Sequence, residues 1–117
     1  MYDLEVTLNK FLNSICDCSN GELDDDYDFI NNKVGVYFLV ENTGHLEFKK
    51  AYSVDIHFYS LKVNKIDLLK LVDKVEEAIG NKIIDGFYFT HKNIYHLIPR
   101  DDKDKEHHIL TYYANKY

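Results

Sequence analysis

The sequence contains only two cysteines, and they stand almost side by side. A bridge between Cys16 and Cys18 would close a very small, strained ring. We therefore interpret both as free thiols, which are typical of proteins that fold in a reducing, intracellular environment. Without disulfides the chain depends on its core, and 117 residues are enough to bury roughly two thirds of the unfolded surface in one domain, 1–117.

Long apolar runs and basic clusters are also missing. No stretch approaches the roughly 20 apolar residues that span a bilayer, and the acidic residues in segment 1–10 make a signal peptide unexpected. The 14 Lys and Arg residues are scattered and include a single Arg, while the formal net charge is −6. A protein that grips nucleic acid usually has a basic stripe. We therefore expect no specific DNA binding, although an acidic surface can lie close to DNA without adhering to it.

The sequence has none of the local motifs of catalysis or metal binding. It lacks GxSxG, P-loop, GxGxxG and HExxH patterns. None of its six histidines combines with the cysteines at full zinc-finger spacing or with another histidine at HExxH spacing. His107 and His108 are adjacent, which in a strand places them on opposite faces. We therefore predict that the protein is not an enzyme and has no catalytic residues, no cofactor and no metal site.

The segment 16–33 is polar and contains a run of acidic residues: Asp24, Asp25, Asp26 and Asp28. An EF-hand counted from Asp24 needs Gly at position six and Glu at position twelve, where this chain has Phe29 and Gly35. We therefore interpret the run as a solvated acidic loop rather than a calcium site. Tyr27, Phe29 and Ile30 within the loop predict that part of it packs down against the sheet.

Two periodic patterns that follow one another dominate the rest of the chain. Between residues 48 and 60 apolar and polar side chains alternate, which predicts a strand with one buried face. From 65 to 79 apolar residues recur at three- and four-residue steps, which predicts an amphipathic helix. Asn64 is placed to cap this helix, and Gly80 stands just past its end. The patterns together indicate a helix that packs on a sheet.

Further elements follow from the same signals. The segments predicted as a first helix and as strands are 2–15 for the helix and 34–41, 46–60, 83–91, 93–99 and 108–117 for the strands. A turn at 41–44 joins the first two strands, and we expect a bulge around Lys49 and Lys50 or a long strand that outruns its partner. The predicted fold class is α+β, in the order α-β-β-α-β-β-β. It is a mostly antiparallel sheet of four to five strands with two helices, the main helix packed on the sheet.

The order and character of these segments resemble those of a known family. The alternating strand YSVDIHFYS, the helix IDLLKLVDKVEEAIG and the late aromatic strand HHILTYYANKY carry the likeness. In this respect the chain resembles the small tail-terminator and head–tail joining proteins of long-tailed bacteriophages and prophages, also described as minor capsid or tail-completion proteins. The resemblance covers residues 2–114, although the acidic loop 16–33 does not align.

The resemblance implies structural work rather than chemistry. Members form homohexameric rings that cap the tail tube, stop its polymerisation and provide the face to which the head docks. The implied partners are further copies of the chain, tail-tube proteins and head-connector proteins, while DNA passes through the lumen without specific binding. The protein would assemble in the host cytoplasm and then remain in the neck or tail of the virion, with no membrane involved.

Subunits of such rings meet head to tail, through a heterologous interface that closes. The residues expected to supply apolar contact between subunits are Val36, Phe38, Tyr88 and Tyr112. The acidic loop, with Asp24, Asp25, Asp26 and Asp28, would face the lumen or a partner. Six chains at −6 each carry −36, a charge that DNA can pass without adhering to it.

The acidic composition also supports a second interpretation from a different class. A small immunity or inhibitor-type protein can neutralise a cationic protein partner by charge complementarity. The acidic segments 24–28 and 101–104 would then form the contact surface. A monomer in solution would favour this interpretation, and a ring would exclude it.

Overall fold

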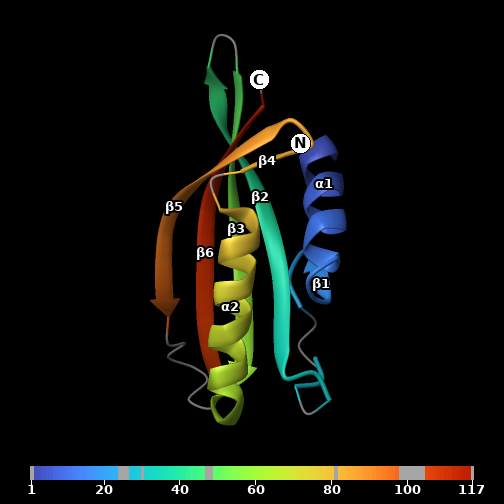
Figure 1. The fold of residues 1–117 in the computed structure, drawn as a ribbon, viewed down its shortest axis with the longest axis vertical. Coiled ribbons are helices and arrows are strands. Elements are labelled where there is room, and N and C mark those ends of the chain that lie inside the picture. The colour runs from blue at the N-terminus through green and yellow to red at the C-terminus, as the bar shows by residue number, and fades with distance from the viewer. Residues whose placement is uncertain are drawn as a thin grey trace.

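The structure is a computed structural model that describes residues 2–23, 27–29, 31–46, 49–80, 82–97 and 105–116. It consists of two helices packed on a strongly twisted sheet (Figure 1). The elements in chain order are α1 Tyr2–Asn13, β1 Cys18–Asn20, β2 Val34–Leu46, β3 Lys49–Leu61, the 3-10 turn η1 Lys62–Asn64, α2 Lys65–Ile79, β4 Ile83–Ile84, β5 Phe87–Leu97 and β6 Lys105–Lys116.

The sheet has six strands in the order β1-β2-β3-β6-β5-β4. Only β1 runs parallel to its neighbour, β2, and all other paired strands are antiparallel. The central pair is β3 with β6, which stay in register over their full length, from Lys50 opposite Lys116 to Leu61 opposite Lys105. The two hairpins β2–β3 and β5–β6 are therefore joined edge to edge into one sheet.

Both helices lie on the same face of the sheet and bury their apolar stripes there. In α1 the stripe is Leu4, Leu8 and Leu12, spaced four residues apart, and each of these side chains is fully buried. In α2 it is Leu68, Val72, Val75 and Ile79. In β2, β3 and β6 the residues that meet the two helices stand at even positions: Val36, Phe38, Tyr52, Val54, Ile56, Phe58, Leu110, Tyr112 and Ala114. Burial of these groups is the main source of stability, at about 25 cal/mol per Å² of apolar surface.

The predicted class is confirmed at the level of α+β with two helices, the longer one on the sheet. The predicted strand count and order are wrong in detail, because the sheet has six strands and is mixed. The additional strand β1 lies in the segment interpreted as a polar loop. Its pairing depends on Asn13, whose side chain accepts a hydrogen bond from Cys18 N at 3.0 Å and donates one to Cys18 O at 3.0 Å.

The strands after α2 are divided differently from the prediction. A two-residue turn at Asp85 and Gly86, with φ of 48° and 85°, separates β4 from β5. Two positive φ values in a two-residue loop are the mark of a type I′ hairpin, for which Asp-Gly is a preferred sequence. The break predicted between 91 and 93 is a register shift inside β5 instead, between His91 and Asn93.

The hairpin β2–β3 is longer than predicted. The residues expected to form its turn at 41–44 are part of β2, which continues to Leu46. The irregularity expected at Lys49 and Lys50 lies instead on β2 between Asn42 and Gly44, opposite Tyr52 and Ala51. Beyond this register shift the ladder continues for three more residue pairs, from Gly44 opposite Ala51 to Leu46 opposite Lys49, and the tip lies outside the described residues.

The predicted limits of α2 hold, while one of its caps does not. Asn64 precedes the helix, but its side chain makes no capping hydrogen bond, since a 3-10 turn leads directly into the helix there. Gly80 follows the last helical residue with φ of 40°, and its N–H donates to Glu76 O. The helix α1 ends at Asn13, two residues before the predicted limit.

Candidate functional site

The sheet face opposite the helices is the candidate functional surface. Neither helix of the described residues covers it, because α1 and α2 both lie on the other side (Figure 1). We call it the open face. The side chains that β2, β3 and β6 present there stand at odd positions: Tyr37, Leu39, Glu41, Ser53, Asp55, His57, Tyr59, His107, Ile109, Thr111 and Tyr113.

Four rings on the open face form a compact cluster, which we call the ring cluster: Tyr37, His57, Tyr59 and His107. Tyr37 stacks on His57 with centroids 4.5 Å apart and an interplanar angle of 3°, and Tyr59 stacks on His107 at 3.9 Å and 15°. In the sheet register, Tyr37 stands opposite His57 and Tyr59 stands opposite His107, so each stack is a direct cross-strand pair. The cluster therefore ties β2, β3 and β6 together through side chains.

The two stacks are joined by their histidines. His57 Nδ1 and His107 Nε2 lie 2.9 Å apart, which is hydrogen-bond distance. Burial lowers the pKa of His57, although the nearby carboxylates of Asp55 and Glu22 oppose this shift. Burial also raises the pKa of Tyr37, and a hydrogen bond with Tyr59 adds to the effect. Both shifts in pKa favour the uncharged forms of Tyr37 and His57 near pH 7.

One end of the open face is covered by the segment that precedes β2. A Cβ atom on Gly35 would lie 2.6 Å from Leu23 Cδ1 and 3.0 Å from Tyr27 Cε1, so the segment rests directly on the strand. Phe29 makes an edge contact with Tyr27 at 4.9 Å, and Lys105 Nζ lies 4.9 Å from the Phe29 ring. This confirms the prediction that Tyr27 and Phe29 pack down on the sheet, whereas Ile30 lies outside the described residues.

The acidic run is only partly described. Asp24, Asp25 and Asp26 lie outside the described residues. Asp28 is exposed, and its carboxylate accepts hydrogen bonds from Asn31 N at 3.2 Å and from Asn31 Nδ2 at 2.6 Å. It therefore closes a local turn. The role predicted for these four residues, facing a lumen or a partner, stays a prediction.

The residues predicted to form a subunit interface are mostly placed in the core. Val36, Phe38 and Tyr112 are 1%, 0% and 1% exposed, because their even positions point toward the helices. They therefore offer no side-chain surface to a neighbouring subunit. Tyr88 is half-buried on β5, and its predicted interface role stays a prediction.

The ring cluster was not identified from the sequence, although a signal was present. The alternation through 52–60 puts residues 53, 55, 57 and 59 on the face opposite the apolar side chains. The adjacent pair His107 and His108 likewise guarantees one histidine on each face of the last strand. What the pattern does not give is the register between the strands, which places His107 beside His57.

The described residues contain no arrangement suited to metal binding or nucleophilic catalysis. No group of three or more His, Cys, Asp or Glu side chains among them is placed to hold a metal ion. Cys16 and Cys18 are free thiols. Burial raises the pKa of both, to about 12 for Cys18, where the neighbouring Cys16 adds to the effect. A thiol that stays protonated at neutral pH is a poor nucleophile.

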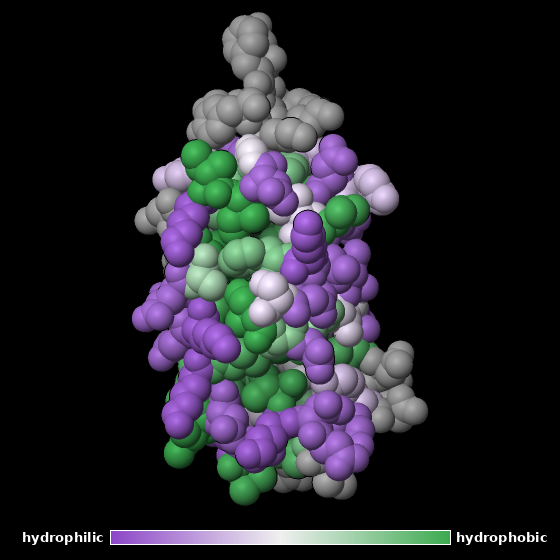
Figure 2. Space-filling view, turned by 45° about the vertical axis from the view of Figure 1, so that its right-hand side comes forward, coloured by the Kyte–Doolittle hydropathy of each residue, from purple (hydrophilic) through white to green (hydrophobic). Residues whose placement is uncertain are grey.

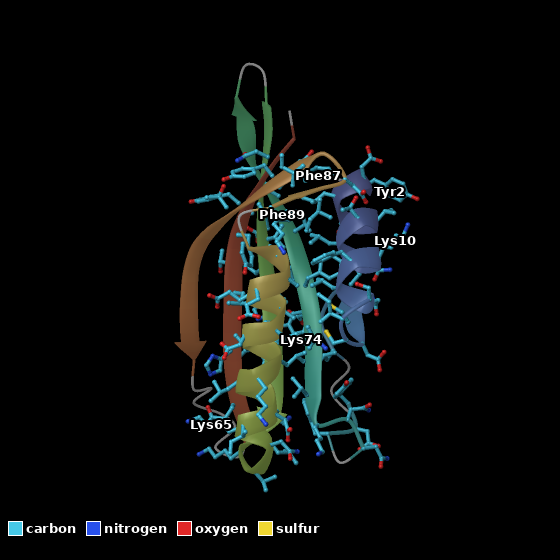
Figure 3. The ribbon with its side chains drawn as sticks, viewed as in Figure 1. Tyr2, Lys10, Lys65, Lys74, Phe87 and Phe89 are labelled. Atoms are coloured by element: carbon cyan, nitrogen blue, oxygen red, sulfur yellow. The ribbon has the colours of Figure 1, made fainter. Side chains whose placement is uncertain are left out.

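The outer side of the molecule has a shallow hollow and an apolar strip. The hollow, of about 320 Å³, is lined by Tyr2, Glu5, Val6, Asn9, Lys10 and Asn20. Tyr2 and Lys10 project from α1 away from the sheet (Figure 3). Figure 2 shows apolar side chains gathered along the molecule between polar margins. Neither feature contains a set of groups suited to catalysis.

Comparison with known proteins adds no family to these observations. No protein-family model matches the chain, and no curated protein matches it. Neither helix in the described part of the chain is long and apolar enough to cross a membrane. The open face and the edges of the sheet are therefore the structural features that bear on function.

Proposed function

We propose that this chain is a structural phage protein of the neck or tail end, a tail terminator that closes into a ring of identical subunits, caps the tail tube and joins it to the head. The observation that carries the proposal is the pair of long unpaired edges on opposite sides of one sheet. The resemblance of the sequence to tail terminators, outlined above, gives this geometry its biological setting.

The two outer strands of the sheet are too short to cover their neighbours. β1 pairs with β2 only at 36–38, and β4 pairs with β5 only at 87–88. Among the described residues, no strand pairs with the outer edges of β2 at 39–46 and of β5 at 90–97. Unpaired edges of this length readily accept another strand.

The direction of these edges suits head-to-tail assembly. β2 is antiparallel to β3, β3 to β6 and β6 to β5, so β2 and β5 run in opposite directions. When copies stand side by side in one orientation, β5 of one copy therefore meets β2 of the next as an antiparallel pair. A heterologous contact of this kind gives a ring when the rotation between neighbouring copies closes after a whole number of subunits.

The two edges must be staggered to pair over their full length. Val40 lies opposite Val54, Val54 opposite Tyr112, and Tyr112 opposite His91. Residues 39–46 of β2 are thus level with the first half of β5 rather than with its end. A sheet that closes on itself requires a stagger of this kind between its strands.

In such a ring the open face would line the bore, with both helices outside. Glu41 and Asp55 give its middle a negative character. The one basic side chain described on the open-face strands is Lys105, which lies at the covered end beside Phe29. A bore of this charge lets DNA pass without adhering to it.

The test is the mass of the particle in solution. Light scattering over a concentration series, with negative-stain images of the same sample, should show about six times 13.8 kDa and a central hole. Hydrogen exchange of ring against monomer should then show new protection at 39–46 and 90–97. The amides between β3 and β6 are an internal control, because they are already paired within one chain and should exchange alike.

Other results would contradict particular parts of the proposal. If a ring forms but the exchange rates at 39–46 and 90–97 equal those of the monomer, the ring part of the proposal stands and the contact between the β2 and β5 edges is overturned. A monomer that also fails to bind the ends of purified tail tubes would overturn the tail-terminator function. The acidic-inhibitor interpretation would then be favoured, although its segments 24–26 and 101–104 lie outside the described residues.

A further inference from the structure

The two histidines of the ring cluster face each other through ring nitrogens. At 2.9 Å, His57 Nδ1 and His107 Nε2 have room for one hydrogen between them. One nitrogen donates and the other must accept through its lone pair, so the contact needs at least one ring to be neutral. A second proton would place two N–H groups and two positive charges face to face.

The surroundings hold the pair in this position. His107 is 7% exposed and lies beneath Tyr59, while His57 lies beneath Tyr37. The rings of the two histidines are 5.1 Å apart and inclined by 23°, so the four rings form one continuous stack across three strands. Little water can enter to separate the two charges of a doubly protonated pair.

Charged groups reach the pair from several elements. The carboxylate of Asp55 on β3 and that of Glu22, from the segment before β2, both act on His57. Lys105 stands two residues before His107 on β6, and the backbone register of β5 places Leu97, which does not titrate, opposite His107. The carboxylates favour a first proton on the pair, while a second one is opposed by the charge of the first.

We propose that the His57–His107 pair is an acid-sensitive latch, which keeps the ring cluster and the described residues 22–23 and 27–29 closed on the open face until both rings are protonated. Once both carry a proton, repulsion separates the rings and opens the stack. Leu23 and Tyr27 rest on Gly35, which stands opposite Tyr59 in the register. Opening of the stack therefore releases this segment as well. The latch operates within one chain and does not depend on a ring.

The direction of the effect follows from the pKa of His57, which burial holds below its ordinary value of about 6.5. A group whose pKa is depressed in the closed state stabilises that state above the unperturbed pKa, and the contribution is lost as the pH falls below it. For each proton that only the open state accepts, the opening equilibrium rises by up to about tenfold per pH unit. The latch is therefore closed at pH 7.5 and weakened near pH 5.5.

Hydrogen exchange with mass spectrometry at pH 7.5 and 5.5 tests this proposal. After correction for the intrinsic pH dependence of exchange, the amides of peptides over 22–38 and 105–111 should exchange up to about tenfold faster at pH 5.5 than at pH 7.5. Peptides over α2 should change much less. Exchange that rises equally in all peptides would overturn the latch, because it would show only a global loss of stability.

Variants identify the residues responsible. His57→Gln and His107→Gln should each reduce the pH dependence of 22–38, since each removes one of the two rings whose joint protonation opens the pair. His45→Gln is the matched control, because the register places it opposite Lys50, far from the pair, and it should keep the wild-type dependence. The slope with pH is compared, so a uniform loss of stability in a variant does not obscure the result.

Titration of the unmodified protein by NMR needs no variant. The histidine Cε1–H signals of His57 and His107 should titrate as a coupled pair, with the second proton binding well below pH 6.5. Two independent titrations near pH 6.5 would overturn the proposal, as would Gln variants that retain the full pH dependence.

Discussion

Gly35 illustrates how one residue without a side chain determines where a segment docks. Its backbone is ordinary for a strand, so flexibility is not the reason for glycine here. The reason is space, because Leu23, Tyr27 and Phe29 all approach the position that a Cβ atom would occupy. A glycine in an apolar strand often marks such a close approach, but the sequence does not say what approaches it.

Gly35→Ala should therefore destabilise the protein by about 1–3 kcal/mol, the usual cost of forcing a methyl group into a packed site. The new Cβ would lie 2.6 Å from Leu23 Cδ1 and 3.0 Å from Tyr27 Cε1, so these two side chains must shift. Urea unfolding followed by circular dichroism measures the loss.

A double-mutant cycle assigns the cost to that contact. In a Leu23→Ala background the atom nearest to the new Cβ is gone, so Gly35→Ala should cost clearly less there than in the wild type. Equal costs in both backgrounds would show that the segment does not rest on Gly35.

At the scale of elements, α2 and β1 mark the limits of what the sequence could predict. The helix was predictable because its apolar residues repeat at helical spacing over fifteen residues, from Lys65 to Ile79. β1 was not, because three residues show no period. It depends on the side chain of Asn13 and on a strand that begins at Val34.

The two faces of the sheet show a second limit on what the sequence could predict. Val36 and Phe38 were predicted to meet a neighbouring subunit because their strand is apolar at almost every position. Such a run does not reveal which face is covered. The structure shows that even positions meet the helices and odd positions, such as Tyr37, belong to the ring cluster. The alternation in β3 did predict two faces, but the pairing of His57 with His107 required the register of β6.

Two adjacent leucines of α2 test the packing of this helix. Leu68 is fully buried, whereas Leu69 is 38% exposed. Leu68→Ala should cost about 2–5 kcal/mol, because it leaves a cavity beneath the helix. Leu69→Ala should cost about 1 kcal/mol or less, as is usual for partly exposed positions.

Both leucine variants are best compared by urea unfolding at concentrations where the protein is a monomer. The two substitutions remove the same atoms from the same helix, so helix propensity affects both alike. Similar losses of stability in the monomer would contradict the orientation of α2 on the sheet.

At the scale of the molecule, charge and shape act against each other during assembly. The described part is elongated, 46 × 27 × 22 Å, and each chain carries a net charge of −6. Subunits that meet along their long sides bring these charges close together. Salt screens such repulsion over a Debye length of about 10 Å at 0.1 M and about 3 Å at 1 M.

Ring formation should therefore strengthen with salt. Between 0.05 and 0.5 M NaCl, the protein concentration at which half of the chains are assembled should fall several-fold, as measured by light scattering. Sucrose at matched osmolality is the control, because it does not screen charge. A ring that weakens as salt is added would show that ion pairs hold the interface, contrary to the edge contact proposed here.

The place of β6 at the centre of the sheet has a consequence for synthesis on the ribosome. β3 emerges early, but its partner β6 is the last strand to be made, after α2, β4 and β5. During that interval α2 can cover the apolar face of the β2–β3 hairpin, but the inner edge of β3 stays without its partner. Such an edge can recruit a strand from another nascent chain. The yield of soluble protein should therefore depend on how quickly translation delivers the last strand.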